Sequence, residues 1–202
     1  LGESYFSNRQ DRYLVIENCP DLANYYEHVY KICKRIVNPR LEPLPFSELS
    51  AFKTQQTKYR AAKTNETVSI ECLTSNLISN SESFSRKIVD AKLDDPCAIT
   101  FMTPYLNVED HLIHGLQKQR DVTIISAGLS SNGFKSGNFL SRLIPKVYEQ
   151  LKLILFESLI GNVPKFSFLE YNRENWTFHG KGISIRCLKS SRLIFGSSNY
   201  GI

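Results

Sequence analysis

Alternating polar residues near the end of the chain have the spacing expected of a catalytic surface: Thr177, His179 and Lys181. In an extended strand alternate side chains lie on the same face, so these three would share one face. Trp176 and Phe178 would lie on the opposite face. The spacing therefore predicts a strand with one reactive face and one aromatic face that anchors it in a core.

A histidine and a lysine placed in this way suit the chemistry of phosphate esters. Histidine has a pKa near neutrality, so it can attack phosphorus or give a proton to the departing oxygen. A lysine ammonium can stabilise the charge that grows on the phosphoryl oxygens during displacement. Small hydrogen-bonding residues follow in the run Gly-Ser-Ser-Asn at 196–199. We therefore expect a site for displacement at a phosphodiester.

The pair at 179 and 181, with the run at 196–199, resembles the second repeat of the phospholipase D superfamily, which reads His-x-Lys and then Gly-Ser-x-Asn. The resemblance is closer to one branch, the eukaryotic phosphatidylglycerophosphate synthases of mitochondria. It rests there on the run Tyr171-x-Arg173-x4-Phe178-His179-x-Lys181-Gly182 and on residues 5–13. Segments 103–107, 126–128 and 131–134 also resemble this family, and the resemblance weakens between Asn38 and Ser81.

One position departs from the superfamily pattern. The repeat usually has an aspartate five residues after the lysine, and this chain has Arg186 there. The synthase branch is itself irregular at this position in its second repeat. The departure therefore weakens the general match more than the specific one, and it puts in doubt an aspartate that orients His179.

The resemblance implies an α/β fold, in which a phospholipase D-like half is a mixed β-sheet flanked by helices. Residues 1–20 would be the tail of a first repeat, and residues 21–202 would be the second repeat, with a loop-rich or weakly ordered stretch at 38–82. Two His-x-Lys repeats form one active site in this superfamily. The other histidines, His28, His111 and His114, have no lysine two residues on. We therefore expect a piece of a longer protein that carries one active-site half and is inactive alone.

By resemblance, the whole protein would transfer the phosphatidyl group of CDP-diacylglycerol to sn-glycerol 3-phosphate, releasing CMP, in phosphatidylglycerol and cardiolipin biosynthesis. One histidine would form a phosphohistidine and its partner would protonate the leaving group. The nucleophile usually belongs to the first repeat, so His179 is assigned as general acid and then base, although the nucleophilic role stays open. Lys181, Ser197 and Asn199 would hold the phosphoryl oxygens, and Asn199 is counted with the catalytic residues.

Asp11 is a second candidate, as the acid that hydrogen-bonds the histidine of the first repeat. The equally weighted alternative is a surface aspartate paired with Arg9 or Arg12. Two other functions stay open for the chain. One is a phospholipase D-like phosphodiesterase or nuclease with water or another alcohol as acceptor, and the other is a catalytically inactive interaction fragment.

The expected partners are the two substrates, the missing first-repeat half and an anionic membrane surface. Covalent catalysis needs no metal ion, and no cofactor is expected. The net charge of +5 suits anionic partners, but no basic block alternates with aromatic residues, so nucleic acid is not expected. Family resemblance alone implies a peripheral location on the matrix side of the mitochondrial inner membrane.

Composition places the chain among globular proteins, since 202 residues with 42% apolar and 22% charged residues can form the core of one ordinary domain. Five widely spaced cysteines without a CxxC pair indicate a reducing compartment and no zinc site. No apolar run approaches the roughly 18 residues of a membrane-spanning helix.

Hydrophobic periodicity predicts alternating strands and helices. The expected elements are a strand at 13–17, a helix from Pro20 to about Ile36, a helix at 83–93, a strand at 98–102, a helix at 108–119, a strand at 122–125 and a helix from Pro145 to Gly161. Loops after such strands commonly bind ligands, so 103–107 and 130–134 are candidate substrate contacts. The last helix is apolar on nearly all sides, which favours burial over a membrane-facing surface.

Overall fold

The computed structural model describes residues 7–10, 15–37, 55–60, 67–72, 96–134 and 143–195. Two compact units divide the chain: Leu1–Tyr13 together with Glu82–Ile202 form the first, and Leu14–Ser81 form the second. The expected division into two repeats at residue 20 stays a prediction.

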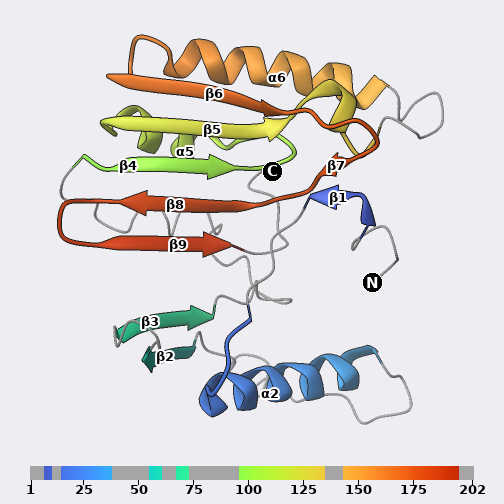
Figure 1. Ribbon diagram of the computed structural model, residues 1–202, viewed down its shortest axis with the longest axis vertical. Helices are drawn as coiled ribbons and strands as arrows, with labels where there is room; N and C mark the ends of the chain where they lie inside the picture. The colour runs from blue at the N-terminus through green and yellow to red at the C-terminus, as the bar shows by residue number, and fades with distance from the viewer. Residues whose placement is uncertain are drawn as a thin grey trace. The chain divides into compact units, whose positions relative to one another are not determined.

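A five-stranded mixed sheet is the centre of the first unit (Figure 1). Its strands lie in the order β6-β5-β4-β8-β9, in which β4, β5 and β6 are parallel while β8 is antiparallel to both β4 and β9. Their bounds are β4 Ala98–Met102, β5 Asp121–Ala127, β6 Lys165–Tyr171, β8 Gly182–Arg186 and β9 Ser191–Phe195. The predicted α/β class with a mixed sheet and flanking helices is confirmed.

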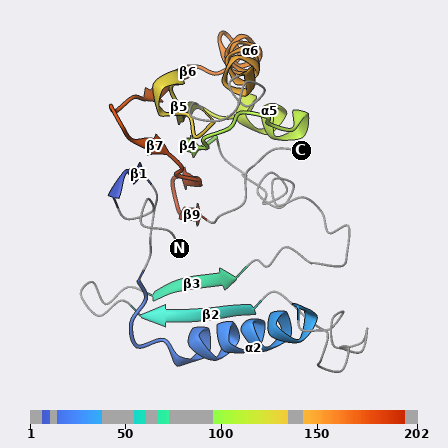
Figure 2. The ribbon, with the colours of Figure 1, turned by 90° about the vertical axis from the view of Figure 1, so that its right-hand side faces the viewer.

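Helices α5 (Asp110–Gln117) and α6 (Ile144–Leu159) cover the same face of this sheet (Figure 2). Alternate residues of the inner strands point toward them, as the burial of every second residue in β4 and β5 shows. The core contains Ile99, Phe101, Leu112, Leu116, Val122, Ile124, Leu155, Leu159, Ile183 and Ile185. The helices were predicted from periodicity, and this shared apolar face explains why they form.

The opposite face of the sheet carries a row of hydroxyl residues. Strand register places Ser167, Thr123, Thr100 and Ser184 side by side, followed by Leu193 on the last strand. The four hydroxyl residues are half-buried and Leu193 is 54% exposed. This face is therefore more polar than the face that packs on the two helices.

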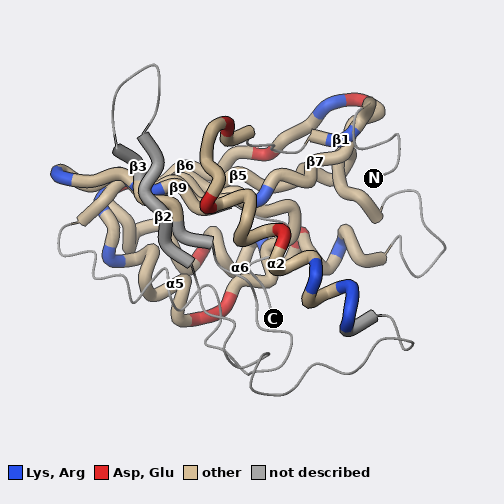
Figure 3. The backbone as a smooth tube through the Cα atoms, turned by 90° about the horizontal axis from the view of Figure 1, so that it is seen from below, with Lys and Arg blue, Asp and Glu red and all other residues tan. Residues whose placement is uncertain are grey.

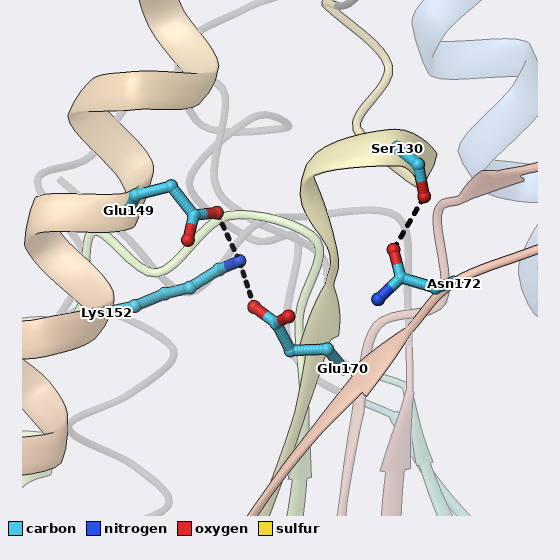
Figure 4. A network of polar contacts seen from close by, with 5 residues as sticks. All are labelled: Ser130, Glu149, Lys152, Glu170 and Asn172. Carbon is cyan, nitrogen blue, oxygen red and sulfur yellow. Dashed lines mark hydrogen bonds and ion pairs between the residues drawn. The ribbon is translucent and has the colours of Figure 1, made fainter.

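Helix α6 is buried on one side only, which differs in part from the expectation of a buried helix. Leu155 is 2% exposed and lies in the core, whereas Val147 and Ile154 are 58% and 57% exposed. Lys152 is also buried, and its ammonium lies 2.6 Å from the carboxylates of both Glu149 and Glu170 (Figure 4). A buried lysine requires such partners, so this cluster fixes α6 against β6.

The second unit contains α2 (Pro20–Val37) and the antiparallel pair β2 (Gln55–Arg60) and β3 (Thr67–Cys72). The pair lies inside the stretch 38–82, which was expected to be rich in loops. Lys and Arg gather toward the C-terminal end of α2, where cations interact favourably with the helix dipole (Figure 3).

Several other features of the described residues differ from the sequence-based expectations. Residues 15–17, part of the expected strand at 13–17, are irregular, and the expected helix at 83–93 lies outside the described residues. Strands β6, β8 and β9 were not predicted. A disulfide joins Cys97 to Cys187 with their Cα atoms 4.5 Å apart, whereas the cysteine count had indicated reduced thiols.

Candidate functional site

The candidate site lies at the carboxyl edge of the parallel strands, where ligands commonly bind in open α/β sheets. Strand β8 is antiparallel to β4 and pairs Gly182 with Met102, the last residue of β4. Lys181 therefore emerges beside the loop that follows β4. Because β5 and β6 run parallel to β4, the loops after Ala127 and Tyr171 reach the same edge.

A short parallel strand pair holds the backbone just before Lys181. β1 (Arg9–Gln10) pairs with β7 (Thr177–Phe178), and His179 N–H donates to Gln10 O at 2.7 Å. The sequence predicted one extended strand through His179 and Lys181. Instead, the regular strand ends at Phe178, and residues 179–181 connect β7 to β8.

His179 and Lys181 are in direct contact. The Lys181 ammonium lies 3.1 Å from each ring nitrogen of His179 and donates to the His179 carbonyl oxygen at 3.1 Å. Lys181 is only 3% exposed, while the His179 side chain is half-buried. A buried cation next to a partly accessible imidazole can hold a phosphoryl oxygen while the imidazole moves a proton.

Phe178 is the anchor of this segment. It is 5% exposed, packs with Met102 and Ala127, and stacks on Tyr171 at a centroid distance of 5.3 Å. Trp176 was expected to share this role, but its half-buried ring lies 3.8 Å from the Arg173 guanidinium in a cation–π contact. One of the two predicted anchors is therefore in the core, and the other lies by an exposed arginine.

The loops that follow β5 and β6 are joined by polar contacts. Ser130 Oγ donates to Asn172 Oδ1 at 2.6 Å (Figure 4), and Arg173 N–H donates to Ser131 Oγ at 3.1 Å. Gly128 N–H donates to Tyr171 O at 3.0 Å. A Cβ atom on Gly128 would overlap the amide group of the Asn172 side chain, so a larger residue at this position requires Asn172 to move.

The two predicted substrate loops meet at this edge. The rings of Tyr105 and Phe134 are 5.3 Å apart, and Thr103 Oγ1 donates to the Tyr105 carbonyl oxygen at 2.9 Å. Burial raises the pKa of the Tyr105 phenol, a charge on Tyr148 would raise it further, and Arg9 lowers it in part. Tyr105 therefore stays a neutral hydrogen-bond donor at physiological pH.

Three predicted site residues, Asp11, Ser197 and Asn199, lie outside the described residues, so their roles stay predictions. Among the residues that the structure describes, no group of three His, Cys, Asp or Glu side chains could hold a metal ion. None of the described helices combines the length and hydrophobicity needed to cross a bilayer.

Sequence reasoning did not assign a site role to Arg9 or Asn172. Arg9 pairs with Thr177 across β1 and β7 and acts on the Tyr105 phenol. Asn172 follows directly on Tyr171, inside a run that carried the family resemblance. Its link to Ser130, 42 residues earlier, depends on strand order and has no local signal.

Comparison with known proteins gives relatives over the whole chain. The chain is 24% identical to a probable CDP-diacylglycerol--glycerol-3-phosphate 3-phosphatidyltransferase of Dictyostelium discoideum. It is 20% identical to the mitochondrial protein of that name from Homo sapiens. The matches cover 100% of this chain but only 43% and 46% of those proteins. The chain therefore spans less than half the length of these relatives, and the resemblance read from its motifs is confirmed.

Among solved structures, the phosphatidylserine synthase of Haemophilus influenzae Rd KW20 matches 60% of this chain and 32% of its own, with 20% identity and a TM-score of 0.42. No protein-family model matches the chain.

Replacing Gly128 with alanine tests the close approach of the two loops. We expect Gly128→Ala to lower the free energy of unfolding by about 1 kcal/mol, because the new methyl group forces the exposed Asn172 side chain aside and breaks its hydrogen bond with Ser130. Asn172→Ala removes the obstructing side chain. In the double variant the effect of Gly128→Ala should largely vanish, as measured by denaturant unfolding of the four proteins. Strictly additive effects would show that the overlap does not occur.

Proposed function

We propose that this chain is one active-site half of a CDP-diacylglycerol--glycerol-3-phosphate 3-phosphatidyltransferase. The observation that carries the proposal is the contact of His179 with the buried ammonium of Lys181 at the carboxyl edge of the sheet. Relatives of that name match the chain over its whole length, which supports the choice of reaction.

In this mechanism, two displacements at phosphorus transfer the phosphatidyl group. A histidine of the other half attacks the phosphorus that bears the diacylglycerol, a phosphorus–nitrogen bond forms, and the bond to the CMP oxygen breaks. His179 gives its proton to that oxygen, and Lys181 stabilises the charge on the phosphoryl oxygens. His179 then takes the proton of a glycerol 3-phosphate hydroxyl, whose oxygen attacks phosphorus and releases the histidine.

The other half of the same protein is the partner that we assign to the hydroxyl-bearing face of the sheet. Both flanking helices lie on the opposite face. Leu169 and Leu193 on the hydroxyl-bearing face are 51% and 54% exposed. Since the relatives are more than twice the length of the matched region, a second half has the size to cover this face.

A membrane surface is the second partner, because the donor is a lipid. The outer side of α6 exposes Val147, Leu153 and Ile154, each more than half accessible. Such an apolar strip can enter the headgroup region of a bilayer without crossing it. The name of the human relative includes a mitochondrial location, which supports a mitochondrial membrane as this surface. The peripheral site on the matrix side of the inner membrane rests on the family resemblance.

His179→Asn in a protein that contains both halves tests the chemistry. We expect the rate of CMP release from CDP-diacylglycerol to fall at least about 100-fold, because the proton donor is lost. Lys181→Met should cause a comparable fall. The matched control is His114→Asn, an exposed histidine on α5, which should keep the wild-type rate. A His179→Asn protein with normal turnover would disprove the proposal.

The choice of acceptor is tested in the same assay. Glycerol 3-phosphate should increase CMP release and appear in the lipid product. If water replaces glycerol 3-phosphate as acceptor with no loss of rate, the protein is a phosphodiesterase of the phospholipase D type. If neither acceptor supports turnover, the remaining interpretation is a catalytically inactive interaction fragment.

The double variant Val147→Ser, Ile154→Ser tests the membrane surface. We expect its affinity for vesicles of phosphatidylcholine and phosphatidylglycerol to fall at least about fivefold, because two apolar side chains no longer enter the bilayer. Val15→Ser serves as the control, since Val15 is 80% exposed and belongs to the second unit. Co-sedimentation with the vesicles measures both. Equal losses for the two proteins would exclude α6 as the contact.

A further inference from the structure

Three aromatic rings from distant parts of the sequence gather beside the candidate site. Tyr105 follows β4, Phe134 follows the 3-10 helix η1 (Leu129–Ser131), and Tyr148 lies in the second turn of α6. Tyr105 stacks on Tyr148 with centroids 5.1 Å apart and planes 29° from parallel, and its centroid is 5.3 Å from that of Phe134. All three side chains are half-buried, so the cluster keeps accessible surface.

The cluster lies at the same edge as the phosphate-binding lysine. Met102 ends β4 opposite Gly182, so Tyr105 and Lys181 come from adjacent chain segments that both emerge at this edge. Tyr105 is three residues beyond Met102 and Lys181 is one residue before Gly182, so both lie within a few residues of this strand pair. Arg9 borders the cluster, since its charge acts on the Tyr105 phenol.

We propose that Tyr105, Phe134 and Tyr148 bind the pyrimidine base of the nucleotide donor. Aromatic rings provide stacking surfaces for any base, and a phenol that stays protonated can donate a hydrogen bond to a base carbonyl. An acyl chain fits the cluster less well, because it offers no hydrogen-bond partner to the hydroxyl groups of the two tyrosines that it would cover. The choice of a pyrimidine as the base rests on the proposed function.

The loop that carries Phe134 is held in place before any ligand binds. Asn132 is 4% exposed, and its Oδ1 atom accepts a hydrogen bond of 3.0 Å from Phe134 N–H. Gly133 is exposed between them, and a Cβ atom there would come within 3.3 Å of the Tyr105 hydroxyl. A fixed ring reduces the entropy that binding a base would otherwise cost.

The test compares two ligands that differ by the base. CMP and ribose 5-phosphate are titrated into the full chain by calorimetry, for wild type, Tyr105→Leu and Tyr105→Phe. We expect Tyr105→Leu to weaken CMP about fivefold or more and to leave ribose 5-phosphate unchanged. Tyr105→Phe keeps the ring but loses the hydroxyl donor, so it should weaken CMP by a smaller factor. Tyr26→Leu is the control, because Tyr26 is 55% exposed on α2 in the second unit. If Tyr105→Leu does not fold, Tyr148→Leu takes its place.

Unchanged CMP affinity in the leucine variant would overturn the proposal, and so would an equal loss for both ligands. The result is separable from the transfer reaction. If a protein with both halves releases no CMP from CDP-diacylglycerol but the leucine variant still binds CMP more weakly, the proposed function fails and the base site stands. If transfer occurs and the KM for the donor is unchanged in the variant, the base site fails and the function stands.

Discussion

The antiparallel pairing of β8 with β4 is the constraint on which the rest of the site depends. Because Gly182 is opposite Met102, the chain enters the sheet at the edge where β4, β5 and β6 end. Lys181 therefore meets the loops of three parallel strands. If the same residues entered at the opposite edge, Lys181 would lie near the beginning of β4, far from Tyr105 and Ser130.

The buried polar groups at this edge of the sheet have hydrogen-bond partners. Lys181 is almost inaccessible, yet its ammonium has the His179 carbonyl and ring nitrogens as neighbours. The His179 N–H is in turn bonded to Gln10, so a strand from the start of the chain fixes the histidine. Phe178, directly before His179, packs in the core with Met102 and Ala127. This preorganisation lets a cation and an imidazole act together without a large rearrangement.

Much of this arrangement could be predicted from the sequence, because hydrophobic periodicity is a local property. The helices α2, α5 and α6 and the strands β4 and β5 follow from it. The alternation of His179 and Lys181 predicted a shared face of one strand, but the two residues meet in the connection that follows β7. Contacts such as Ser130 with Asn172 depend on strand order, which no local pattern encodes. The exposed side of α6 was also missed, because Val147 and Leu155 are equally apolar and only packing distinguishes them.

We propose His179 and Lys181 as half of an active site. The most direct measurement is CMP release from CDP-diacylglycerol by this chain alone, by the proposed first-repeat half alone, and by the two mixed. We expect no release by either piece and recovered release in the mixture when glycerol 3-phosphate is present. Release by this chain alone at the rate of the intact protein would contradict it.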